Sequence, residues 1–103
     1  MDFEGLASRL GIDTGDFIEL AALFVTTTQA DIEKIRAAMA VGNPADAAAA
    51  AHSIKGAAAN LGFEDMAELA KKMEFQGKDG DLSGFDRELD EFQILLHRLE
   101  GQL

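Results

Sequence analysis

A histidine, a lysine and a glycine stand close together in the segment AHSIKGAAANLG, residues 51 to 62, whose alanines favour a helix. Helical side chains lean toward the N-terminus, so a side chain at position 56 would lie over His52. Gly56 leaves that imidazole uncovered, although glycine costs a helix ~1 kcal/mol relative to alanine. Lys55, one turn after the histidine, can place its ammonium group beside the ring. An open imidazole next to a mobile cation suits a histidine that must meet an anion carried by another macromolecule.

Glu74 is the acidic residue that the predicted fold brings back toward this histidine. His52 lies ten residues before Gly62 and Glu74 lies twelve residues after it. On antiparallel neighbouring helices these separations correspond to ~15 and ~18 Å from the turn. A carboxylate at that level can accept a hydrogen bond from one ring nitrogen and leave the other nitrogen as a nucleophile. The spacing predicts proximity only, and a solvated surface acid is the competing interpretation.

The same residues resemble a known motif. His52, Ile54, Lys55 and Gly56, followed by Leu61 and Gly62, are similar to the H-x-[LI]-K-G motif and the closing L-G of the histidine-containing phosphotransfer (HPt) domain family. The sequence AELAKKME, residues 67 to 74, also resembles the next helix of that family, and the resemblance covers nearly the whole chain. The departures are mild. They are Ile54 where leucine is commoner, Met73 before the acidic residue, and alanines at positions 57 to 59 where serines are frequent.

The resemblance implies a phosphorelay intermediate in two-component signalling. His52 would accept a phosphoryl group on Nε2 while Glu74 holds Nδ1, Lys55 would neutralise the phosphoryl oxygens, and Gly56 would keep the approach open. The partners implied are a histidine kinase or hybrid kinase and the aspartate of a response-regulator receiver domain. Mg²⁺ and the acidic pocket would belong to the receiver, so we expect no metal and no cofactor in this chain.

The chain also lacks a glycine-rich nucleotide loop, and we therefore expect a phosphocarrier without an ATP site rather than an enzyme. The alternative function is an HPt-like adaptor that docks receivers or a kinase without carrying phosphate. A di-metal bundle enzyme would need Glu-x-x-His pairs, but Ala49 and Ile94 stand three residues before the two histidines.

Small residues around the histidine predict a docking surface. Ala48, Ala49 and Ala59 would form a flat apolar rim for a receiver helix, although such alanines, Ala49 above all, can equally serve helix propensity alone. Asn60 could cap the end of its helix or face the partner. For Gly56, a tight helix crossing is the competing structural interpretation.

Composition limits the class of protein further. A chain of 103 residues predicts one domain, residues 1–103. The absence of cysteine excludes disulfides and fits a reducing cytoplasm. No apolar run approaches the ~20 residues of a membrane span, and acidic residues rather than a signal pattern follow Met1. We therefore expect a cytoplasmic protein. We also expect a monomer, although no feature of the sequence determines the oligomeric state.

The charge argues against nucleic acid as a partner. Nineteen acidic residues against nine basic ones give a net charge of −10, whereas phosphate-backbone binding depends on Lys and Arg. The same charge argues against anionic membranes. We expect most of the acidic residues to be solvated helix surface that promotes solubility.

Hydrophobic periodicity predicts only helices. A short helix ends at Gly11, a second runs from Asp13 or Thr14 to Val41-Gly42, and a third covers Pro44 to Leu61 after the N-cap Asn43. A fourth runs from Glu64 to about Gln76, residues 77 to 84 form a loop, and Ser83 with Asp86 resembles the capping box of the last helix. The expected fold is all-α, an antiparallel up-down-up-down four-helix bundle with a short N-terminal capping helix.

Two other features invite a functional interpretation and are explained more simply. His97 lies beside Arg98 without a suitably spaced acid or glycine, and we interpret it as a surface histidine. The loop that begins at Asp79 partly imitates an EF-hand, with Asp81, Ser83 and Asp90 at ligand positions. Arg87 at the ninth position and aspartate instead of glutamate at the twelfth argue against calcium.

Overall fold

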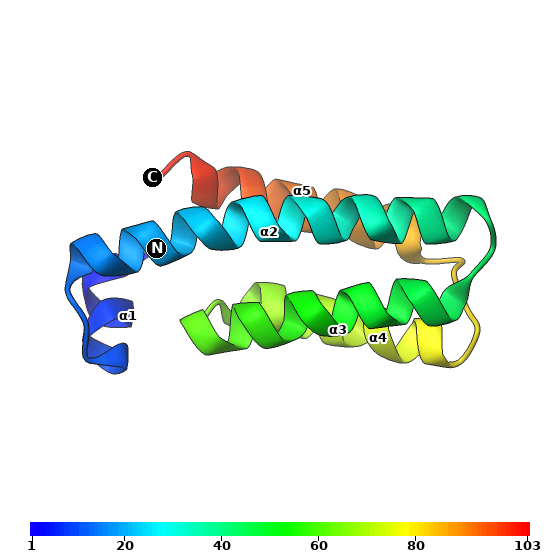
Figure 1. Ribbon diagram of the computed structural model, residues 1–103, viewed down its shortest axis with the longest axis horizontal. Helices are drawn as coiled ribbons and strands as arrows, with labels where there is room; N and C mark the ends of the chain where they lie inside the picture. The colour runs from blue at the N-terminus through cyan, green and yellow to red at the C-terminus, as the bar shows by residue number, and fades with distance from the viewer.

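Five helices account for most of the chain. The computed structural model describes residues 1–103, and its helices are α1 (Phe3–Leu10), α2 (Thr14–Ala40), α3 (Pro44–Leu61), α4 (Glu64–Lys78) and α5 (Phe85–Glu100). Helices α2 to α5 alternate in direction along a body of 42 × 21 × 17 Å, and α1 lies at one end (Figure 1). The fold is the all-α, up-down-up-down four-helix bundle that the sequence predicted.

The helix ends follow from local backbone chemistry. The side chain of Asn43 accepts a hydrogen bond from the backbone N–H of Asp46 at 3.1 Å, and Pro44 occupies the first helical position of α3. Gly62 ends α3 in the left-handed conformation, with φ of 81°, which costs a residue without Cβ little. The turn from α3 to α4 is therefore sharp, and the two helices run back antiparallel as neighbours.

A core of 21 buried residues fills the bundle. Phe63, directly after the α3–α4 turn, packs edge-on against two rings of α2, with centroid separations of 5.9 Å to Phe17 and 5.2 Å to Phe24. Such aromatic pairs add about 0.5–1.5 kcal/mol beyond their buried area. Phe63 therefore anchors the α3–α4 hairpin, which carries the candidate site, to the long helix α2.

Two predicted details differ from the structure. Helix α4 continues through Gly77 to Lys78 instead of ending near Gln76. Ser83 does not cap α5, because its hydroxyl and backbone N–H both donate to Asp81 Oδ1, and Gly84 stands at the N-cap without a side-chain hydrogen bond.

None of the five helices combines the length and the apolarity that crossing a bilayer requires.

Candidate functional site

Helices α3 and α4 approach each other closely at a pair of small residues. A Cβ atom built on Gly77 would lie 2.9 Å from Cβ of Ala48 and 3.0 Å from the carbonyl oxygen of Pro44, so only glycine fits there without movement. The antiparallel register that places Gly77 opposite Ala48 places Glu74, about one turn earlier on α4, opposite His52, about one turn later on α3. The close approach therefore brings the acid within reach of the imidazole.

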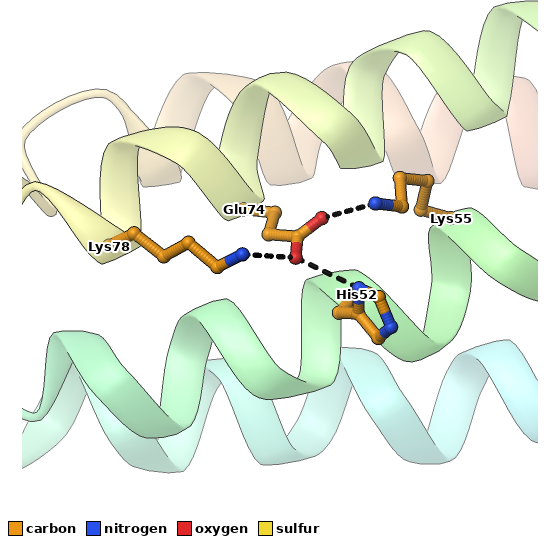
Figure 2. A network of polar contacts seen from close by, with 4 residues as sticks. All are labelled: His52, Lys55, Glu74 and Lys78. Atoms are coloured by element: carbon orange, nitrogen blue, oxygen red, sulfur yellow. Dashed lines mark hydrogen bonds and ion pairs between the residues drawn. The ribbon is translucent and has the colours of Figure 1, made fainter.

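The Glu74 carboxylate is the centre of a polar network between the two helices (Figure 2). Its side chain is only 2% exposed, although glutamate is almost never buried unless it is paired. Oε2 lies 2.8 Å from Nδ1 of His52 and 3.0 Å from Nζ of Lys78, and Oε1 lies 2.7 Å from Nζ of Lys55. Oε1 is buried and has no well-aligned hydrogen-bond donor, so Lys55 is held there as an ion pair.

These contacts keep Glu74 ionised. The Lys55 ammonium group first, with Lys78 and His52 after it, lowers the pKa of the Glu74 carboxyl from 4.5 to about 2, although burial acts in the opposite direction. An ionised carboxylate can only accept hydrogen bonds, so Nδ1 of His52 must be the donor in their shared bond. In the neutral imidazole the other nitrogen, Nε2, then carries the free lone pair. The carboxylate therefore selects the tautomer in which Nε2 is a nucleophile.

The free nitrogen of this ring faces outward. The His52 side chain is 65% exposed, and Figure 2 shows Nε2 directed away from Glu74. Nothing lies within 4 Å of a Cβ atom built on Gly56, so this glycine is not a helix crossing and the space beside it is open. The ring is thus fixed on one side by a buried acid and accessible on the other.

Lys78 is a member of the network that sequence reasoning missed. It lies four residues after Glu74 on α4, and its side chain is 62% exposed. The i, i+4 spacing of an acid followed by a lysine is a known helix-stabilising pair, and this signal could have identified the contact. A helix that ends near Gln76, as the sequence predicts, excludes this pair because position 78 then falls in the loop.

A shallow groove continues from the histidine along α3 and α4. It is lined by His52, Glu74 and Lys78 together with small residues, namely Pro44, Ala45, Ala48, Ala49, Gly77 and Gly80. Of the predicted docking residues, Ala49, Ala59 and Asn60 are exposed, whereas Ala48 is buried against Gly77 at the base of the groove. The end of α3 is capped by the backbone N–H of Gly62, without the side chain of Asn60.

The second histidine and the acidic loop lie outside this network. His97 is exposed near the C-terminal end of α5. In the loop before α5, Asp81 accepts two hydrogen bonds from Ser83, which lower the pKa of the Asp81 carboxyl. The local turn thus accounts for the loop residues that imitate a calcium ligand set.

The buried acid, the fixed tautomer and the exposed Nε2 leave His52 able to act as a nucleophile on the flank of a four-helix bundle. The sequence model of the Hpt domain family matches residues 19–102, and the chain belongs to this family. No curated protein and no solved structure matches it. Helix α1 lies outside the matched residues.

Membership of the family establishes the general role. Hpt domains carry phosphoryl groups in two-component signalling, interact with kinases and receiver domains, and have no catalytic site of their own.

Proposed function

We propose that His52 is the phosphoacceptor of this Hpt domain and that it exchanges the phosphoryl group with the aspartate of a receiver domain. The observation that carries the proposal is the 2.8 Å contact between Nδ1 of His52 and the buried carboxylate of Glu74. That contact orients the imidazole and leaves Nε2 exposed as the nucleophile. His97 has no such acid beside it.

The proposed step needs no proton transfer on this chain. The lone pair of Nε2 attacks the phosphorus of the aspartyl phosphate, the N–P bond forms, and the P–O bond breaks with its electron pair leaving on the aspartate oxygen. The imidazole keeps its Nδ1 proton and becomes cationic. The Glu74 carboxylate, already ionised at neutral pH, stabilises that positive charge through the existing hydrogen bond.

Lys55 supplies positive charge to the phosphoryl oxygens in this proposal. Lys55 follows His52 by about one helical turn, and before the transfer its Nζ forms an ion pair with Glu74 Oε1. A flexible lysine stem allows the ammonium group to turn toward the phosphoryl group as negative charge arrives. Phosphoryl transfer depends mainly on such positioning and charge stabilisation, with Mg²⁺ supplied here by the receiver partner rather than by this chain.

Incubation with phosphorylated receivers of the source organism tests the proposal. We expect an acid-labile, alkali-stable label on the wild-type chain that is lost in His52→Gln. The matched control is His97→Gln, which removes the other histidine and should leave labelling unchanged. Because the incubation covers all receivers, it also identifies those that can pass a phosphoryl group to this chain.

Two outcomes would overturn the proposal. A label that persists in His52→Gln would place the phosphoryl group elsewhere. A chain that binds receivers but is labelled by none of them, nor by a kinase, would instead be an adaptor that docks without carrying phosphate.

A further inference from the structure

One carboxylate in this site is shared by two lysines, and only one of them has a role in the proposed reaction. Lys55 contacts Glu74 Oε1 at 2.7 Å and Lys78 contacts Oε2 at 3.0 Å. Lys78 reaches Glu74 from the following turn of the same helix, whereas Lys55 reaches it from α3 (Figure 2). The proposed reaction therefore does not explain why Lys78 also contacts Glu74.

The proposed role of Lys55 creates a problem for Glu74. To neutralise a phosphoryl group on Nε2, Nζ of Lys55 must leave Oε1, which is buried and has no other donor. Removing one partner from a buried ion pair is strongly unfavourable, because the remaining charge stays desolvated without compensation. Without Lys78, His52 would be the only contact that Glu74 keeps when Lys55 moves, and the carboxylate would hold Lys55 back and oppose the transfer.

We infer that Lys78 is the positioning residue that compensates Glu74 while Lys55 moves to the phosphoryl group. This inference rests on the proposed function of His52. Lys78 suits the role because its contact with Oε2 is independent of the atom that Lys55 leaves. Its side chain is 62% exposed, against 30% for Lys55, so its ammonium group stays partly hydrated when paired. The last turn of α4 also favours a cation there through the helix dipole.

The inference predicts that Lys78 acts through Glu74 and not on the phosphoryl group. In Lys78→Met we expect the phosphorylation of His52 to slow by about fivefold, the effect of losing one partly exposed ion pair. In a Glu74→Gln background the carboxylate that Lys78 compensates is gone, so adding Lys78→Met should change the rate little. Lys78→Arg keeps the charge and should restore most of the rate, which a general loss of stability would not allow.

The measurement is a double-mutant cycle over positions 74 and 78, with phosphoramidate as the phosphoryl donor. Its P–N bond breaks to release ammonia as the Nε2–P bond forms, so no protein partner takes part. The control is Lys71→Met, which removes the same charge from an exposed position of α4 whose ammonium group lies 5.8 Å from the ring of Phe75. Its rate should equal that of the wild type.

Several results would overturn the inference. Equal rates in the wild type and Lys78→Met would show that Glu74 needs no second cation. Rate losses that multiply in the double variant would place Lys78 on the phosphoryl group itself. A loss seen with a receiver but not with phosphoramidate would make Lys78 a docking residue. If His52 takes no phosphoryl group from any donor, the proposed function fails instead, and this result is distinct from the other three.

Discussion

Gly77 of α4 lies directly against Ala48 of α3, with room for no side chain between them. A Cβ atom on Gly77 would lie 2.9 Å from Cβ of Ala48 and 3.1 Å from its backbone nitrogen. Neither residue has a polar side chain, yet their contact determines how closely the two helices approach at the level of the site. The separation of His52 and Glu74 therefore depends on a glycine one turn away from the chemistry.

We predict that Gly77→Ala moves α4 away from α3 and weakens the His52–Glu74 hydrogen bond. Overpacking of this kind costs about 1–3 kcal/mol, and the helix propensity that alanine adds, about 1 kcal/mol, offsets part of the loss. We expect a net decrease in the free energy of unfolding in urea and slower phosphorylation of His52. The hydrogen-bonded Nδ1 proton should also exchange faster with water in NMR spectra. A variant as stable and as fast as the wild type would show that the contact is not tight.

Gly56 on α3 differs from Gly77 because there is free space around it. Because nothing lies within 4 Å of a Cβ atom at this position, Gly56→Ala should stabilise the bundle by about 0.5–1 kcal/mol through helix propensity. Gly56→Gln should keep the fold but extend a side chain over His52 and slow phosphoryl transfer by about tenfold or more. Thermal unfolding and transfer rates of the two variants separate these effects. An unchanged rate in Gly56→Gln would contradict the access argument.

The two glycines show what sequence reasoning can and cannot recover. The sequence predicts Gly56 as an open position, and the structure agrees, because the direction of helical side chains is a local property that spacing alone determines. The sequence predicts Gly77 in a loop, because a glycine near the end of a periodic segment is a usual stop signal, whereas the structure places it within α4. Its true reason, the contact with Ala48, lies between residues far apart in sequence, and no local pattern encodes which helix pair approaches most closely.

The error at Gly77 also concealed part of the site. Periodicity predicts the order of the helices, and Asn43 and Gly62 are recognisable as caps from their residue types. The rise per residue predicts that Glu74 lies at the level of His52. The sequence does not predict the contact of Lys78, because a helix that ends at Gln76 cannot present an i, i+4 pair between positions 74 and 78. The burial of the Glu74 carboxylate is likewise beyond the sequence, because the spacing predicts proximity only and leaves a solvated acid as the competing interpretation.

Lys55→Ala should slow phosphoryl transfer and leave the fold intact. The lysine is a partly exposed residue whose only polar contact is Glu74, and Lys78 and His52 remain to compensate the carboxylate. Helicity measured by circular dichroism should therefore match the wild type, while the transfer rate falls because the phosphoryl oxygens lose their neutralising cation. Global unfolding of Lys55→Ala would instead identify the lysine as a structural residue.

Glu74 should make the free energy of unfolding decrease at acidic pH. Its folded-state pKa of about 2 lies below the ordinary 4.5, so its contribution is complete above pH 4.5 and is lost as the pH falls from 4.5 toward 2. We expect Glu74→Gln to lower the free energy of unfolding at pH 7 by on the order of 1–2 kcal/mol, allowing for solvent screening at the exposed Lys78 and His52.

The measurement is urea unfolding of the wild type and Glu74→Gln at several pH values. The difference between the two proteins should shrink steadily below pH 4.5. Glu68→Gln provides a matched control, because this exposed glutamate of α4 is not part of the network. A difference that stays constant down to pH 3 would mean that the carboxylate contributes through its shape and not through its charge.

Glu88 should have the opposite effect on the pH dependence of stability, destabilising the protein when its carboxyl group is ionised. It is 3% exposed on α5, and the amide nitrogen of Gln76 donates to both of its carboxylate oxygens, at 3.1 Å in the case of Oε2. Burial raises the pKa of Glu88, with Lys72 opposing the shift and Glu91 and Asp81 adding to it. A raised folded-state pKa means that stability is fully present below the ordinary value and decreases as the pH rises through the folded-state pKa.

Replacing this carboxyl group with an amide should therefore stabilise the bundle at neutral pH. We expect Glu88→Gln to raise the free energy of unfolding by on the order of 1 kcal/mol at pH 7, because a desolvated charge is removed while an acceptor for Gln76 remains. The gain should disappear near pH 4, where Glu88 is protonated in both folded and unfolded chains. Glu91→Gln, on the exposed side of the same helix, should show a smaller change. Destabilisation by Glu88→Gln at pH 7 would mean that the charged hydrogen bonds from Gln76 outweigh the cost of burying the carboxylate.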